Sequence, residues 1–208
     1  MKALIYTFFL AAMFFQCSPK NNTSLYLKNN LAGKSIYQGS NDCIVDFDDF
    51  DKLTRTRIIG LKSERLFTYT HEKLIEIFVD KPFMETSGAL SKNNRNEYFL
   101  LLSFTIDTKY VKSGYNGIST TNMLRISLIN GEVVFLTNIL NDNGKIDKST
   151  GDITYSGIFP VSKKNLKFLR KYELDKLGVM WNGGFEEYNV FNLDLLKRHI
   201  ECLKDFHF

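Results

Sequence analysis

Apolar and polar residues alternate most regularly over residues 97–107, near the middle of the chain. In an extended strand, one face of this segment would be wholly apolar and the other half apolar. The wholly apolar face would carry Tyr98, Leu100, Leu102, Phe104 and Ile106. Strands that are apolar on both faces lie inside a sheet, so this segment is predicted to be a central strand.

Shorter runs of apolar and β-branched residues predict further strands on both sides of this one. They cover residues 56–61, 65–69, 83–90, 123–129, 132–138, 152–161, 177–181 and 187–192. Asn130-Gly131 separates two of these runs. It is typical of a tight hairpin turn in which both residues adopt a positive φ.

Helical spacing of apolar residues predicts two short helices before the central strand. Residues 46–52 would form one of them and would bury Phe47 and Phe50 on the same side. Residues 71–79 would form the other, with Thr70 as its N-cap.

Two more helices are predicted near the C-terminus. Ser162 would cap a helix over 163–177, and Asn192 would cap an amphipathic helix over about 193–205. The apolar face of the last helix would carry Leu195, Leu196, Ile200 and Leu203. Together the elements predict an α+β fold: a mostly antiparallel sheet or sandwich of about seven strands, with short flanking helices and the C-terminal amphipathic helix.

The first 24 residues follow a different pattern. A basic start at Met1-Lys2 leads into residues 3–15, which carry no charge and are almost wholly apolar. A polar segment that contains Pro19 follows from Gln16 onward. This arrangement is typical of a secretory signal, and its apolar part is short for a permanent membrane helix.

Cys17 stands just after the apolar part, so the segment resembles the signal peptide of bacterial lipoproteins. The resemblance implies that Cys17 receives a diacylglyceryl group and fatty acids such as palmitate, which would anchor the protein to a membrane. Gln16 departs from the small residue usual before this cysteine. An ordinary cleavage that leaves Cys17 unmodified, or an uncleaved anchor, is therefore the alternative.

These features predict a signal peptide over 1–16, a lipidated cysteine and flexible tether over 17–40, and a single globular domain over 41–208. The expected location is the cell membrane or the outer membrane, facing the periplasm or the cell surface. With Cys17 acylated, Cys43 and Cys202 are the two remaining cysteines. An even pair in an oxidising compartment indicates a disulfide, and two separate buried thiols are the alternative.

The formal net charge is +4, from 27 basic and 23 acidic residues, which argues against a dedicated nucleic-acid-binding protein. The sequence has no P-loop, no GxGxxG and no GxSxG motif, and we predict no cofactor.

Residues 141–147 resemble the middle of an EF-hand calcium loop, but Ile139 and Thr150 stand where its end carboxylates are needed. A polar turn without a metal is predicted there. The histidines have no metal-binding spacing and are expected at the surface or as helix caps: His71, His199 and His207.

The most unusual local sequence surrounds a predicted turn and contains the only tryptophan. Its candidate ligand-binding residues are Trp181, Phe185, Glu186, Glu187 and Tyr188. Exposed aromatic rings beside hydrogen-bonding groups suit a ligand surface, whereas a plain hairpin would pair Trp181 with Tyr188 across its strands. A buried Trp181 would remove the first interpretation.

Four carboxylates also gather in one segment: Asp46, Asp48, Asp49 and Asp51. Such runs are usually solvated, but with Glu186 or Glu187 they would supply the acid and base of a hydrolase, provided that the carboxylates lie within about 10 Å.

The leading hypothesis is therefore a membrane-anchored envelope lipoprotein with a non-enzymatic interaction or structural role. Its partner would be an envelope protein or a glycan. The alternatives are a peptide- or glycan-binding module that uses the segment 181–188, and the carboxylate-dependent hydrolase.

Overall fold

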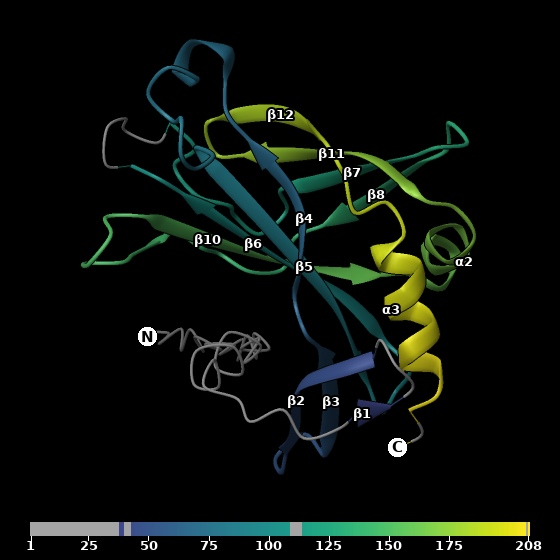
Figure 1. Ribbon diagram of the computed structural model, residues 1–208. Helices are drawn as coiled ribbons and strands as arrows, with labels where there is room; N and C mark the ends of the chain where they lie inside the picture. Colours follow the sequence, from purple (N-terminus) through teal and green to yellow (C-terminus); the bar gives the residue numbers. More distant parts are fainter. Residues whose placement is uncertain (1–37, 40–42, 109–113, 207) are drawn as a thin grey trace, which may run out of the picture.

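Two antiparallel sheets, with two α-helices on one side, make up the part of the chain that the computed structural model describes (Figure 1). The described residues are 38–39, 43–108, 114–206 and 208. The predicted signal peptide, Cys17 and residues up to 37 lie outside them. The predicted fold class, α+β with mostly antiparallel strands, is confirmed.

The larger sheet has the order β1-β2-β3-β5-β6-β10-β9, and β4 also pairs with β5. Its strands are β1 (Gln38–Gly39), β2 (Cys43–Asp51), β3 (Thr56–Leu61), β4 (Glu64–Tyr69), β5 (Met84–Asn93), β6 (Tyr98–Ile106), β9 (Lys145–Ile146) and β10 (Ile153–Val161). The five apolar residues predicted for one face of β6 are all buried, and the strand lies between β5 and β10. The predicted central strand is therefore confirmed.

The smaller sheet has the order β12-β11-β7-β8. Its strands are β7 (Met123–Leu128), β8 (Val133–Thr137), β11 (Leu174–Trp181) and β12 (Gly184–Asn189). The β7–β8 hairpin forms where the sequence predicts it, but its turn is different. Of Asn130 and Gly131 only Gly131 has a positive φ, at 85°. Hydrogen bonds between Leu128 and Glu132 and between Gly131 and Leu128 close a longer loop.

The two sheets face each other and are joined at both edges. At one edge Ile139 N–H donates to the carbonyl of Ile158, and at the other Phe191 N–H donates to the carbonyl of Leu66. Aromatic rings from the two sheets meet in the core between them. The ring centroids of Phe67 and Tyr188 lie 4.8 Å apart, as do those of Phe104 and Trp181.

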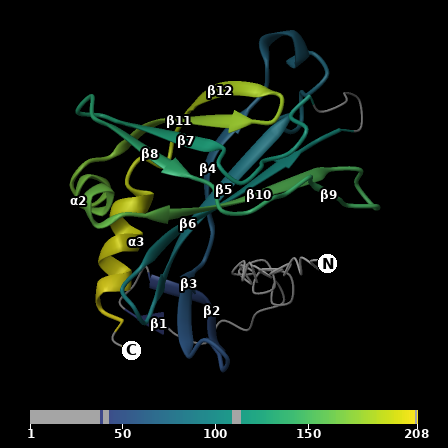
Figure 2. The ribbon, with the colours of Figure 1, turned by 180° about the vertical axis from the view of Figure 1, so that it is seen from behind.

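The helices α2 (Lys163–Lys171) and α3 (Leu195–Lys204) pack side by side at one side of the molecule (Figures 1 and 2). The predicted Ser162 cap is confirmed, because Ser162 Oγ accepts a hydrogen bond from Asn165 N–H. The four apolar residues predicted for the inner face of the last helix are buried. In the described part of the chain, no helix has the length and apolar character that crossing a membrane requires.

Two C-terminal predictions are wrong. The helix predicted over 163–177 ends at Lys171, because Leu174 already pairs with Leu128 in the smaller sheet. Asn192 does not cap α3, which begins after Asp194. The Asn192 amide instead donates to the carbonyl of Arg65.

The helix predicted over 46–52 is also wrong, since these residues lie in and directly after β2. Phe47 and Phe50 point to opposite faces of that strand, and Phe50 is 56% exposed. Phe47 lies opposite Gly60 of β3, and its ring occupies the place that a Cβ on Gly60 would take. A cross-strand partner 13 positions away in the chain thus decides the conformation.

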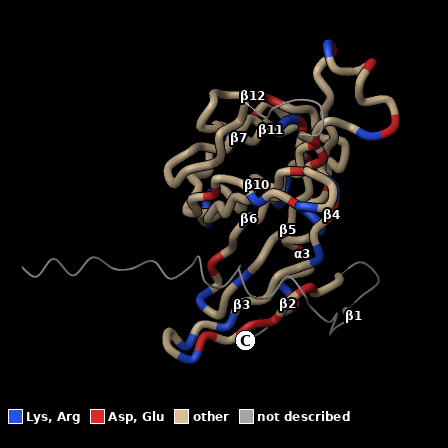
Figure 3. The backbone as a smooth tube through the Cα atoms, turned by 90° about the vertical axis from the view of Figure 1, so that its left-hand side faces the viewer, with Lys and Arg blue, Asp and Glu red and all other residues tan. Residues whose placement is uncertain are grey.

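The helix predicted over 71–79 is replaced by a single short 3-10 turn, η1 (Glu72–Leu74). His71, not Thr70, caps it, because His71 Nδ1 accepts a hydrogen bond from Lys73 N–H. The Thr70 hydroxyl instead accepts a hydrogen bond from Phe83 N–H at the start of β5. This hydrogen bond joins the residue after β4 to the residue before β5. The connection between these two strands projects beside β12 (Figures 1 and 3).

Candidate functional site

A hollow of about 430 Å³ opens at the end of the molecule where β11 meets β12. This volume is within the range of sites for small molecules, roughly 300–1,000 Å³. Aromatic side chains from both sheets and from the connections line it: Tyr69, Phe83, Tyr115 and Trp181. Glu186, on β12, supplies a carboxylate at the same place. We refer to this feature as the hollow.

The Glu186 carboxylate is held by a chain of hydrogen bonds that begins in the core. Trp181 Nε1 donates to the Tyr188 hydroxyl over 3.1 Å, and this hydroxyl donates to Glu186 Oε2 over 2.7 Å. The Tyr115 hydroxyl donates to the same oxygen over 3.0 Å. Glu186 Oε1 makes no hydrogen bond or ion pair with any residue that the structure describes. Among the described residues, one carboxylate oxygen is therefore held by two phenols and the other has no partner.

The phenols around Glu186 lie in a poorly solvated environment. Burial raises the pKa of Tyr115 and that of Tyr188, and the nearby Glu186 carboxylate raises both further. Burial also raises the pKa of Tyr69, with additional contributions from Glu186 and Glu72. The three phenols therefore remain protonated at neutral pH, and those of Tyr115 and Tyr188 serve as hydrogen-bond donors.

The turn between β11 and β12 contains Asn182 and Gly183, and its contacts with residues 114–117 account for the glycine there. Asn182 N–H and Gly183 N–H donate to the carbonyls of Gly117 and Tyr115, respectively. A Cβ on Gly183 would lie 2.2 Å from the carbonyl oxygen of Gly114, so only glycine allows this close approach. The turn thereby positions the segment that presents Tyr115 to Glu186.

The predicted aromatic ligand surface is wrong in its main feature. Trp181 is 2% exposed and Tyr188 is 3% exposed, so neither ring forms an open face. The plain hairpin is also not as predicted, because Trp181 lies opposite Gly184 and Tyr188 lies opposite Leu177, and only a side-chain hydrogen bond joins Trp181 to Tyr188. Trp181, Phe185 and Glu186 line the hollow, but the Phe185 ring also covers Gly178.

Glu187 lies outside the hollow, because neighbouring side chains of β12 point to opposite faces of the sheet. Its carboxylate forms ion pairs with Arg125 and Lys176. Sequence reasoning therefore grouped residues from two faces of one strand. It also missed Tyr69 and Tyr115, which lie far from residue 186 in the chain.

The acidic cluster and Glu186 are not brought together. The cluster belongs to β2, which lies at the opposite end of the molecule from β12 (Figures 1 and 3). Asp48 forms an ion pair with Arg57 of β3, and Asp51 accepts hydrogen bonds from Leu53 N–H and the Thr54 hydroxyl. These carboxylates stabilise the β2–β3 hairpin, and the acid–base pair required for the hydrolase is not assembled.

Residues 141–147 do not form the predicted hairpin turn, because Lys145 and Ile146 form β9 and Asp142 forms a β-bridge with Ile118. Asp142 accepts hydrogen bonds from Gly144 N–H and Ser156 N–H, and Asp147 accepts one from Ser149 N–H. No group of three or more potential metal-ligating side chains lies together among the residues that the structure describes.

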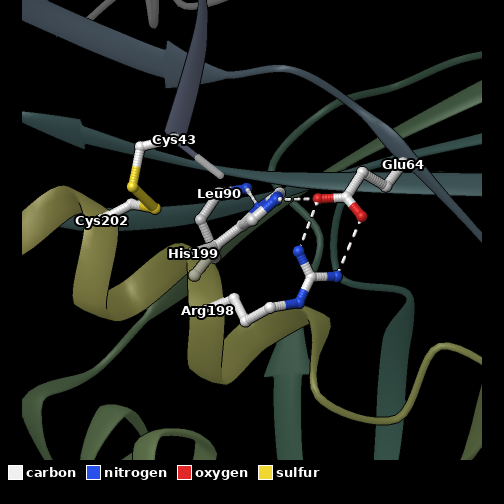
Figure 4. Close-up of a disulfide and its surroundings, with 6 residues drawn as sticks. All are labelled: Cys43, Glu64, Leu90, Arg198, His199 and Cys202. Carbon is white, nitrogen blue, oxygen red and sulfur yellow. Dashed lines mark hydrogen bonds and ion pairs between the residues drawn. A yellow bond between two sulfur atoms is a disulfide. The ribbon is translucent and has the colours of Figure 1, made fainter. Parts of the chain in front are cut away.

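A second polar cluster lies between α3 and the larger sheet (Figure 4). Arg198 binds both oxygens of Glu64 over 3.1 and 2.9 Å, and His199 Nε2 lies 3.0 Å from Glu64 Oε1. His199 Nδ1 accepts a hydrogen bond from Leu90 N–H over 3.2 Å. Because Nδ1 is the acceptor, His199 is neutral and Nε2–H donates to Glu64.

The position of His199 follows from a gap in the strand pairing. β4 pairs with β5 up to Gly88, and β3 pairs with β5 from Ser91 onward. Leu90 N–H lies in the gap, where no strand accepts it, and His199 takes the place of the missing carbonyl. The prediction that His199 lies at the surface or caps a helix is wrong, since it is 2% exposed. His71 is a cap, as predicted, and His207 lies outside the described residues.

Both titratable groups of this cluster have lowered pKa values. Hydrogen bonding to Arg198 lowers the pKa of Glu64 to about 2. Burial lowers the pKa of His199, although Glu64 acts in the opposite direction. The cluster fastens α3 to β4 and β5, and its side chains are fully engaged with one another, which indicates a structural role.

Comparison of the chain with protein families, with curated proteins and with solved structures found no match.

Proposed function

We propose that this protein is an exported lipoprotein, anchored to the cell membrane or the outer membrane through Cys17, with a non-enzymatic interaction role. The observation that carries the proposal is the bond between Cys43 and Cys202 (Figure 4). It joins two of the three cysteines and leaves Cys17, next to the apolar leader, as the remaining one.

A structural disulfide supports an oxidising compartment, since such bonds are rare in the cytosol. Cys43 is the first residue of β2 and Cys202 is a buried residue of α3. Their Cα atoms lie 5.6 Å apart although 159 positions separate them in the chain. The bond therefore links the first long strand of the domain to its last helix, as expected of a domain that folds outside the cytosol.

The interaction role is supported by the hollow. Its described lining is largely aromatic and includes the Glu186 carboxylate, whose orientation is fixed by two phenols. Preorganised polar groups in an apolar recess are typical of binding sites.

The mass of the intact protein extracted from membranes tests the anchor. The wild-type protein is expected to lack residues 1–16 and to carry the added mass of acyl chains on Cys17. The Cys17→Ala variant is expected to carry no acyl chain and to leave the lipid-anchored fraction. A wild-type protein that retains residues 1–16 and has no added mass would contradict the proposal.

A further inference from the structure

We propose that the basic face of α2 lies against a membrane surface that contains anionic phospholipids. This face consists of the five cationic residues of the helix: Lys163, Lys164, Lys167, Arg170 and Lys171. The inference rests on the proposed anchor at Cys17, and it adds an electrostatic contact between the folded domain and the lipid. Three features carry it: the charge of α2, the apolar side chains beside the helix, and its proximity to the start of the domain.

The basic face carries positive charge that the described residues do not neutralise. All five of its cationic residues are exposed, and α2 contains no Asp or Glu. Of the five, only Arg170 forms an ion pair with a described carboxylate, that of Glu201. The first acidic residue after the helix, Glu173, is paired with Lys197 of α3. The part of the chain outside the described residues contains one acidic side chain, Asp42.

This arrangement of charges destabilises the helix when no anion is near. Lys163 and Lys164 occupy the first turn of α2, where the helix dipole favours acidic residues. Lys167 lies one turn away from both Lys163 and Lys171, and like charges at this spacing repel one another. An anionic surface relieves both effects, because it attracts every lysine that lies close to it.

The residue type and the neighbouring side chains favour lipid over an acidic protein. Four of the five cations are lysines, whose mobile point charges suit a fluid layer of headgroups, whereas fixed carboxylates favour arginine. Phe135 is 56% exposed, and its carbonyl accepts a hydrogen bond from the Asn165 side chain of α2. Ile129 is 56% exposed, and its N–H donates to the carbonyl of Glu173. Surfaces that bind at the lipid interface combine basic and apolar side chains in this way.

α2 also lies close to the place where the predicted tether joins the domain. Arg170 is paired with Glu201, and the next residue, Cys202, is bonded to Cys43 at the start of β2. α2 lies on the outer side of α3 in both views of the molecule (Figures 1 and 2). With Cys17 held in the membrane, the contact is intramolecular, so that a weak attraction is sufficient.

Acetylation of individual lysines, followed by mass spectrometry, tests the contact. The full protein, with residue 17 in whatever state it is purified, is mixed with excess vesicles of phosphatidylcholine, either alone or with about one third phosphatidylglycerol. At low salt, acetylation of the α2 lysines is expected to slow at least about fivefold on the anionic vesicles and less than about twofold on the neutral ones. In about 0.5 M salt the protection should disappear. Retention on neutral vesicles reports the anchor separately, so the two proposals fail in different ways.

Two matched variants locate the contact, and each removes three positive charges. The first removes them from the basic face: Lys163→Gln, Lys164→Gln and Lys167→Gln. The second removes them from exposed lysines in other segments: Lys52→Gln, Lys73→Gln and Lys148→Gln. Protection of Lys171 on anionic vesicles is expected to disappear in the first variant and to change less than about twofold in the second. Circular dichroism of both variants confirms beforehand that the fold is retained.

Four results would overturn the inference. They are equal protection on neutral and anionic vesicles, no protection of any α2 lysine, and equal loss of protection in the two variants. The fourth is equal protection by soluble polyglutamate at the same concentration of charge, which would indicate an acidic protein partner in place of lipid.

Discussion

Replacing both Cys43 and Cys202 by serine is expected to lower the free energy of unfolding by about 2–5 kcal/mol, as measured by urea denaturation at pH 7. Without the bond, the unfolded chain gains the freedom of a loop that spans 159 positions. The bond also reinforces a narrow connection, because β1, β2 and β3 join the larger sheet through only three pairs between β3 and β5. Amide hydrogen exchange should therefore increase most in β2 and β3.

The wild-type protein supplies the control for this experiment. A reducing agent should destabilise it by a similar amount and should leave the double serine variant unaffected. If reduction changes neither protein, the two sulfur atoms are not bonded in solution and the compartment argument fails with them.

Replacing His199 by leucine is expected to cost about 2–3 kcal/mol of stability, because it leaves Leu90 N–H without an acceptor in a buried position. It also removes one hydrogen-bond donor from Glu64. Glutamine at position 199 is expected to lose less, since its amide can both accept from Leu90 N–H and donate to Glu64. Urea denaturation of the two variants at pH 7 measures the difference.

The same residue should make the protein sensitive to acid. Since the pKa of His199 is lowered by folding, the unfolded chain binds the proton first, and stability falls as the pH decreases below about 6.5. Glu64 causes a second loss of stability as the pH decreases from its ordinary pKa of 4.5 to its pKa of about 2 in the folded protein. The His199→Gln variant should lack the first loss and keep the second. A wild-type protein whose stability is constant from pH 7 to pH 5 would show that His199 is not held neutral.

The fold class and most strands could be predicted because local alternation is strong. Apolar residues alternate along β6 itself, so its strand conformation can be predicted without knowing its partners. The Ser162 cap lies next to the helix that it caps, so it too is a local signal. The helix predicted over 46–52 failed because Phe47 packs on Gly60, a partner that local spacing does not reveal. The position of β4 is likewise decided by its antiparallel pairing with β5, a segment that is not its neighbour in the local sequence.

The candidate site was only partly predictable for the same reason. Trp181 and Glu186 stand together in the sequence, but Tyr115 reaches Glu186 from 71 positions away. A better assignment of β12 would have separated Glu186 from Glu187 by the alternation of strand faces. His199 had a usable signal, because helical spacing places it on the same face of α3 as Leu195, Leu196 and Leu203, all of which are buried.

The central claim is that the folded domain resides in an oxidising compartment, and the state of its thiols in living cells tests this most directly. Intact cells are treated with acid to stop thiol exchange and are then alkylated before and after reduction. We expect Cys43 and Cys202 to be labelled only after reduction, in every molecule that has lost its leader. Labelling of both cysteines before reduction would place the domain in the cytosol and contradict the account.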